Sequence, residues 1–259
     1  MVWIQLTGPY KLYMKLIKNI LGRLFAVWAL FVFVSTMLVV IIPIIISGIW
    51  KEPKRSVIMH DVFDGWMTLF FILTGVKRKF KGKEYFKKGE TFVVVCNHRS
   101  FMDVPLTSVG VPGPNKTIAK IEMSRIPLFN LVYKRGSVLV DRKNEQSRLE
   151  SYMRMKEVLN WGLHMSIYPE GTRNKTKEPL QRFHDGAFRL AIDCRKPVLP
   201  ALVFYTNEVL PRHKTFYFWP HHVEMHFLPP VSSENKTSRE LRDEVFEIMR
   251  DYYVQHNKS

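Results

Sequence analysis

The chain has 259 residues, enough for one large domain with an accessory segment, and 46% of them are hydrophobic and 24% charged. This composition excludes a disordered protein, and two cysteines, Cys96 and Cys194, exclude a disulfide framework and favour a reducing compartment. The formal charge of +16, from 39 Lys and Arg against 23 Asp and Glu, suits an anionic partner, either nucleic acid or anionic lipid.

The longest uncharged run covers residues 24–50. As a helix it would be about 40 Å long, compared with a hydrocarbon core of about 30 Å, and it exceeds the length of a signal-peptide core. We therefore predict a membrane-embedded helix, with a kink or break at Pro43. Residues 65–76 are apolar but too short to span a bilayer, which favours a short interfacial or re-entrant helix. A full span and a hairpin within one leaflet are both open.

Basic residues flank the apolar run unequally. The excess follows the run, on the side of the larger domain, and this predicts a cytoplasmic location for that domain. The basic cluster from Lys77 to Lys88 comes directly after the second apolar segment, so we expect it to contact anionic head groups. A change of composition near residues 77–90 divides the chain into an N-terminal membrane anchor, residues 1–76, and a larger domain, residues 77–259.

From residue 91 onwards, short apolar runs alternate with amphipathic stretches. The runs that predict strands are 91–96, 117–120, 137–140, 164–168, 198–205 and 223–228. The stretches that predict helices are 146–161, 185–192 and a last helix from residue 238, with Asn144, Asp185 and Ser238 as cap candidates, while 101–110 predicts a short helix or a turn. This alternation predicts an α/β fold in which a mixed, largely parallel sheet is flanked by helices.

Polar clusters follow three of the predicted strands, where an α/β fold gathers its ligands. His98 follows the first of these strands, Asp141 and Arg142 follow another, and residues 168–174 follow a third. Asp103 lies five residues after His98, so a turn that leads into a helix would bring its carboxylate back to the imidazole. We interpret the pair as a general base that takes a proton from a substrate hydroxyl, the alternative being a structural histidine.

The other two clusters carry groups that suit a phosphorylated alcohol. Arg142 and Arg173 each offer a planar fork for a phosphate, and Glu170 offers an acceptor for a hydroxyl or a cation. The alternative for residues 168–173 is an ordinary tight turn. Cys96 precedes His98 inside a buried strand, and we expect its thiol to be inert.

These clusters stand in the order of four known sequence motifs. They are Asn97-His98-x4-Asp103; Lys120-Ile-Glu122 with Ile126-Pro127, Gly136 and Asp141-Arg142; Tyr168-Pro-Glu-Gly-Thr-Arg173; and Lys196-Pro-Val-Leu-Pro200. Together they resemble the motifs of the glycerolipid acyltransferases, the family of 1-acyl-sn-glycerol-3-phosphate acyltransferases, over residues 70–230. The stretch Phe183-His184-Asp185-Gly186 differs from the family, which often has a lysine there.

The resemblance implies a membrane-bound acyltransferase that moves an acyl chain from acyl-CoA or acyl-carrier protein to the sn-2 hydroxyl of lysophosphatidic acid, giving phosphatidic acid. It implies His98 and Asp103 as the catalytic pair and Arg142 and Arg173 as ligands of the acceptor phosphate. Glu170, Gly171 and Thr172 would shape the glycerol pocket, supported by Asn97 and Lys120. No metal, resident cofactor or nucleic acid is implied.

Other interpretations keep part of this picture. The acceptor could instead be glycerol-3-phosphate, another lysophospholipid or a lyso-aminolipid. A non-catalytic, membrane-tethered basic binding protein is a second alternative, which the carboxylates in the same loops disfavour. His222, Glu224 and His226 alternate along one predicted strand and would face a shared ion, although the sequence offers no fourth ligand.

Overall fold

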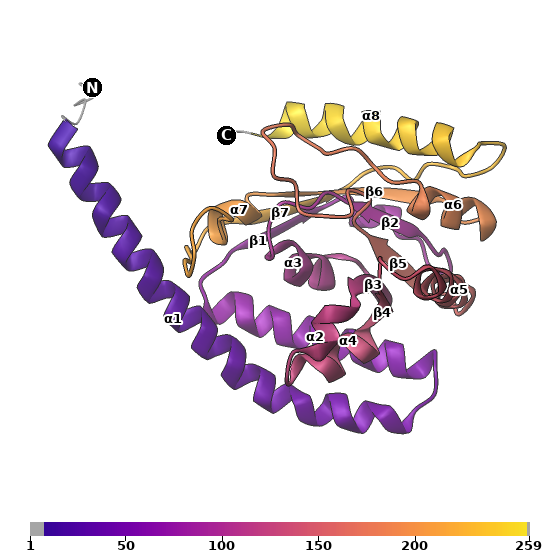
Figure 1. The fold of residues 1–259 in the computed structure, drawn as a ribbon, viewed down its shortest axis with the longest axis horizontal. Helices are drawn as coiled ribbons and strands as arrows, with labels where there is room; N and C mark the ends of the chain where they lie inside the picture. Colours follow the sequence, from indigo (N-terminus) through magenta and orange to yellow (C-terminus); the bar gives the residue numbers. More distant parts are fainter. Residues whose placement is uncertain (1–7, 258–259) are drawn as a thin grey trace.

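The computed structural model describes residues 8–257. Its centre is a seven-stranded sheet with the order β1-β7-β6-β2-β5-β3-β4 (Figure 1). The strands are β1 (Arg78–Lys81), β2 (Val93–Cys96), β3 (Asn115–Lys120), β4 (Ser137–Val140), β5 (His164–Ile167), β6 (Val198–Phe204) and β7 (Val223–Phe227). All neighbouring pairs are parallel except β6 with β7, so the predicted α/β class with a mixed, largely parallel sheet is confirmed.

Helices cover both faces of the sheet (Figure 1). They are α1 (Gly8–Ile46), α2 (Lys54–Leu73), α3 (Asp103–Gly110), α4 (Phe129–Gly136), α5 (Glu145–Asn160), α6 (Gly186–Asp193), α7 (Thr206–Val209) and α8 (Ser238–His256). One apolar core lies between the sheet and the group α1, α2 and α3, and the other lies between the sheet and the group α5, α6 and α8. The central strands β2 and β6 are buried along their whole length, because helices cover both of their faces.

The N-terminal helices differ in extent from the prediction. The helix α1 continues through Pro43 and ends at Ile46, so the chain turns three residues later than the proline suggested. The helix α2 begins at Lys54 and ends at Leu73, so residues 65–73 of the predicted apolar segment form the second half of a 20-residue helix and not a short separate one. Packing of α2 against α1, α3 and α4 stabilises its charged first half, which has no continuous apolar pattern.

The outer surface of the two N-terminal helices is apolar and exposed. Exposed apolar side chains run along α1 from Leu12 to Ile46, and they continue on α2 at Ile72 and Leu73. Residues 12–49 and 54–73 are each long and apolar enough to cross a bilayer. Exposing an apolar surface of this extent to water is unfavourable. Such a surface is typical of a membrane-associated protein.

Two helix caps and one edge strand give three further differences from the prediction. The last helix is capped by Thr237 and not by Ser238, because the Thr237 hydroxyl accepts the Glu240 backbone N–H while the Glu240 carboxylate accepts that of Thr237. Asp185 stands at the expected cap position of α6, yet its carboxylate makes no capping hydrogen bond and binds Arg242 instead. The basic cluster after residue 77 contains the edge strand β1, which the sequence did not predict.

A long loop fastens α1 to the rest of the molecule. We call residues 210–219, which connect α7 towards β7, the strap. The Phe218 N–H donates to the Gly22 carbonyl at 3.0 Å, and the Trp219 ring packs edge-on against Phe25. A Cβ atom on Gly22 would lie 2.0 Å from the Tyr217 ring, so glycine is required where the strap crosses the helix.

Candidate active site

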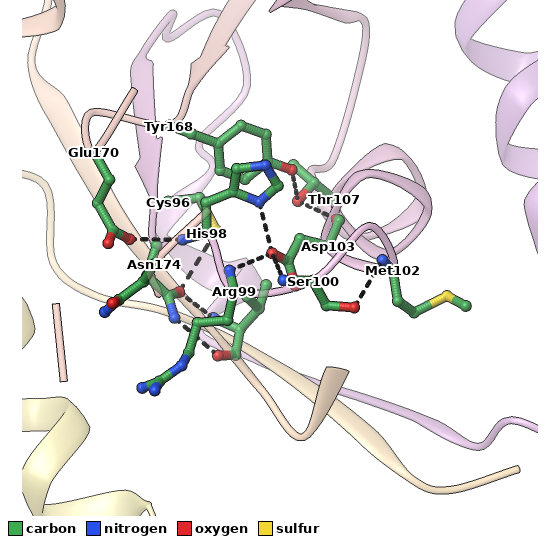
Figure 2. Close-up of polar contacts among 12 residues, drawn as sticks. Cys96, His98, Arg99, Ser100, Met102, Asp103, Thr107, Tyr168, Glu170 and Asn174 are labelled. Atoms are coloured by element: carbon green, nitrogen blue, oxygen red, sulfur yellow. Dashed lines mark hydrogen bonds and ion pairs between the residues drawn. The ribbon is translucent and has the colours of Figure 1, made fainter. Parts of the chain in front are cut away.

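The loop between β2 and α3 brings His98 and Asp103 together. His98 Nδ1 lies 2.7 Å from Asp103 Oδ2, which also accepts the backbone N–H groups of Arg99 and Ser100 (Figure 2). Because three donors converge on one oxygen, Nδ1 acts as a donor and Nε2 is left as the basic nitrogen. The Asp103 side chain is fully buried at the N-terminus of α3, whereas the imidazole remains 16% exposed. The second carboxylate oxygen, Oδ1, is buried without a hydrogen-bond partner.

The turn after β5 holds the backbone of His98 from both sides. Glu170 Oε1 accepts the His98 N–H at 2.7 Å, and the Asn174 N–H donates to the His98 carbonyl at 2.6 Å (Figure 2). The other Glu170 oxygen accepts the Gln181 N–H at 2.9 Å, and the residue is only 3% exposed. Burial raises the pKa of Glu170 to about 7, although these two hydrogen bonds oppose the shift. The Glu170 carboxylate thus holds the loop of His98 and the loop of Gln181. The sequence had instead suggested that Glu170 contacts the glycerol of the acceptor.

An aromatic ring fixes the plane of the imidazole. The ring of Tyr168 stacks on His98 with 4.3 Å between the ring centroids and 25° between the planes. The Tyr168 hydroxyl is within 3.0 Å of the Thr107 hydroxyl on α3, so its ring is held at both ends. Neither this stacking nor the hydrogen bond from Asn174 to His98 was predicted from the sequence. Contacts between residues so far apart in sequence leave no local pattern.

Both predicted phosphate ligands reach the turn at residues 168–173. Arg142, which follows β4, donates through Nη1 to the Gly171 carbonyl. The Arg173 guanidinium lies over the Phe101 ring, 3.6 Å from its centroid. Gly171 has a φ of +69°, a conformation that favours glycine, and this opens its carbonyl to Arg142. Within residues 8–257, neither guanidinium has a carboxylate within salt-bridge distance, so both positive charges are available to an anion.

The remaining predicted residues lie at the same edge of the sheet with different contacts. Asn97 is buried, and its amide group exchanges two hydrogen bonds with the backbone of Val203, at 2.7 and 3.1 Å. It therefore joins the end of β2 to β6. Lys120, at the end of β3, and Thr172, in the turn, are exposed, and in the described part of the chain their side chains make no hydrogen bond to another residue.

A large apolar cavity adjoins the His98 loop. It has a volume of about 670 Å³ and lies between the sheet and the N-terminal helices. Tyr168 and Thr107 line it beside the imidazole, and Arg173 lines it at the turn. Its apolar wall comes from α1, α2 and α4, through residues that include Ala29, Phe33, Phe63, Trp66, Phe70 and Phe129. A space of this size and polarity suits a flexible hydrocarbon chain.

Other reactive side chains take no part in this arrangement. Burial raises the pKa of Cys96 well above its usual value, so its thiol is unreactive. Glu224 and His226 form a pair at 2.7 Å, but the His222 ring stacks on His221 and lies outside that pair. Among the residues that the structure describes, no three potential metal-ligating side chains cluster.

Comparisons with known proteins point to one family. The family model described as Acyltransferase matches residues 77–203. The 1-acyl-sn-glycerol-3-phosphate acyltransferase of Cocos nucifera is 28% identical over 166 residues, which cover 63% of this chain and 53% of that protein. The alpha 1-acyl-sn-glycerol-3-phosphate acyltransferase of Mus musculus is 27% identical over 167 residues, covering 64% and 58%. The chain thus spans little more than half the length of these relatives.

The fold also matches a solved structure. The crystal structure of the 1-acyl-sn-glycerophosphate acyltransferase from Thermotoga maritima superposes with a TM-score of 0.78. The match covers 93% of this chain and 98% of that one, at 23% sequence identity. The likeness therefore includes the N-terminal helices as well as the sheet.

Proposed function

We propose that this chain, whose residues 77–203 match the Acyltransferase family model, transfers an acyl group from a thioester donor to the sn-2 hydroxyl of 1-acyl-sn-glycerol-3-phosphate. The observation that carries the proposal is the His98–Asp103 pair, 2.7 Å apart, beside an apolar cavity of about 670 Å³. The pair suits removal of a proton from an alcohol, and the cavity suits an acyl chain.

In the proposed reaction, His98 Nε2 takes the proton from the acceptor hydroxyl as its oxygen attacks the thioester carbonyl. Asp103 stabilises the imidazolium that forms. The tetrahedral intermediate then expels the thiolate, which takes the proton back from His98, and phosphatidic acid is released. A general base of this kind contributes roughly 10² to 10⁴ in rate. The thioester itself supplies the activated acyl group, so the reaction draws on no metal or resident cofactor.

Arg142 and Arg173 are the proposed ligands of the acceptor phosphate. Both reach the turn that also holds the His98 backbone, and neither is neutralised by a carboxylate among the described residues. Binding of a phosphate between them would set the glycerol hydroxyl at a fixed distance from the imidazole. Gly171 and Thr172 belong to this turn and are the proposed contacts of the glycerol.

The membrane-associated helices support a lipid acceptor. The cavity wall is built from α1 and α2, the helices whose outer surfaces are apolar. A lysophospholipid could therefore reach the site without leaving the bilayer. The excess of basic residues after the apolar run favours the cytoplasmic side for the catalytic domain, where acyl-CoA or acyl-carrier protein would supply the acyl chain.

A different acceptor is the second candidate, and His184 favours it. This residue replaces the lysine that the family often has, and it lies beside the proposed phosphate ligands: a Cβ atom on Gly171 would be 3.1 Å from His184 Nε2 and 3.5 Å from Arg142 Nη1. An imidazole carries less positive charge than a lysine at neutral pH. An acceptor with fewer negative charges than lysophosphatidic acid would suit it.

The proposal is tested by assaying the purified full-length chain with lysophosphatidic acid, glycerol-3-phosphate, other lysophospholipids and a lyso-aminolipid. We expect turnover of lysophosphatidic acid with palmitoyl-CoA or a palmitoyl carrier protein, and near-total loss in His98→Ala with membrane binding unchanged. A preference for another acceptor that reverses in His184→Lys would establish the second candidate. Absence of turnover with every acceptor would refute both.

A further inference from the structure

A second pocket, rich in positive charge, lies beside the apolar cavity. It has a volume of about 610 Å³ and contains side chains from α1, the His98 loop, the segment after the turn, α7 and the strap. Its charged and histidine residues are Lys18, Arg99, Lys175, Arg212, His213, Lys214 and a single carboxylate, Glu208. Five fixed positive charges around one hollow attract an anion strongly.

These charges are not neutralised by the protein. Within residues 8–257, none of the five cations is in a salt bridge. Arg99 donates to the Tyr253 hydroxyl at 3.1 Å, and Lys18 and Lys214 lie over the rings of Trp219 and Tyr217. Neutral partners and aromatic faces hold the cations in place without cancelling their charge.

The basic pocket and the apolar cavity share a wall. Pro211, Arg212, Lys214 and Tyr217, all in the strap, line both spaces. Arg99, which lines the basic pocket, directly follows His98, while Tyr168, which stacks on His98, lines the cavity. One molecule with an apolar chain and an anionic end could therefore occupy both spaces, with its middle near the imidazole.

We propose that the basic pocket binds the phosphorylated nucleotide of an acyl-CoA donor, an assignment that rests on the proposed acyl transfer and specifies its donor. The size of the pocket lies within the usual range for small-molecule sites, roughly 300 to 1,000 Å³. Three phosphate groups on a flexible nucleotide can reach cations inside such a hollow. A folded carrier protein presents a convex surface that cannot enter it, so the shape favours the nucleotide.

The test uses Lys175→Glu, since Lys175 is exposed and its charge faces the pocket from a loop. The matched control is Lys177→Glu, two residues along the same loop, exposed and outside the pocket lining. Binding of free CoA to the full-length protein in detergent is measured by calorimetry. We expect CoA to bind the wild type and the control equally, and Lys175→Glu about tenfold or more weakly.

Steady-state kinetics separate the nucleotide from the rest of the donor. With palmitoyl-CoA, we expect a raised KM and an unchanged kcat in Lys175→Glu; with palmitoyl-pantetheine, which lacks the nucleotide, we expect no change. The double variant Lys175→Ala/Lys214→Ala removes two positive charges of the pocket without introducing a negative charge. CoA binding and kinetics of this variant repeat the test.

Equal CoA binding in all variants, equal losses with both donors, or a wild type that binds only a carrier-protein donor would each overturn the assignment. The binding measurement needs no acceptor. Selective loss of CoA binding in a chain that fails to acylate lysophosphatidic acid would therefore refute the proposed function and leave the donor pocket standing.

Discussion

The imidazole of His98 is held between the ring of Tyr168, whose centroid is 4.3 Å away, and the carboxylate of Asp103, 2.7 Å from Nδ1. The stacking controls the plane of the imidazole, and the carboxylate controls its rotation within that plane. A base that must meet a hydroxyl on a mobile lipid gains from both constraints, because each reduces the number of unproductive orientations.

Replacing Tyr168 tests the stacking. Tyr168→Phe keeps the ring and loses only the hydrogen bond to Thr107, so we expect kcat within about threefold of the wild type. Tyr168→Leu removes the ring, and since a stacked aromatic pair is worth about 0.5–1.5 kcal/mol, we expect kcat to fall by up to about tenfold. Acyl-transfer assays with both variants check this. Equal losses in Phe and Leu variants would assign the effect to the hydroxyl and not to the stacking.

Asp103→Asn isolates the charge of the carboxylate. Because Oδ1 has no partner, the amide nitrogen can take its place while the remaining oxygen keeps all three hydrogen bonds of Oδ2. We expect kcat to fall by roughly 10² to 10⁴. Steady-state acyl-transfer assays of the variant and the wild type measure this loss. A variant with wild-type kcat would show that the carboxylate acts only as a hydrogen-bond acceptor.

Glu170 predicts a pH dependence of stability. Its pKa in the folded protein, about 7, lies above the ordinary value of 4.5, so the neutral form favours folding. This contribution is complete below pH 4.5 and is lost as the pH rises through 7; the difference corresponds to about 3 kcal/mol. Melting temperatures in detergent between pH 4.5 and 8 should therefore fall less steeply in Glu170→Gln than in the wild type. Glu178→Gln, on the exposed part of the same loop, is the control and should keep the wild-type slope.

Much of the fold and part of the site could be predicted from local patterns. The strands that form the buried centre of the sheet are uninterrupted apolar runs, which is why β2 and β6 were identified. The spacing of His98 and Asp103 was sufficient to predict the contact between their side chains, because both residues lie in one short loop. The capping box at Thr237 also had a local signal, Glu240 three residues later, which favours Thr237 over its neighbour Ser238.

Other features depend on contacts that a local pattern does not contain. The strand β1 is four residues long, Arg-Lys-Phe-Lys, and it forms only because β7 offers a parallel edge. Glu170 reaches the His98 backbone across 72 residues of sequence, and the partner is an N–H group that every residue has. The cavity and the basic pocket are spaces between elements, so their linings become visible only when the helices and the strap are in place.

The apolar cavity predicts control of acyl-chain length from α1. Ala29 is buried, and it lines the cavity close to the ring cluster of Phe33 and Trp66. Ala29→Phe should fill part of the cavity, so kcat/KM should fall more for long acyl donors than for short ones. Val27 lies on the exposed side of the same helix and outside the lining, which makes Val27→Phe the matched control. Turnover of a series of acyl-CoA lengths by both variants checks this, because only a chain bound in this cavity would make the first variant, and not the second, prefer shorter donors. Identical length profiles in both variants would place the acyl chain elsewhere.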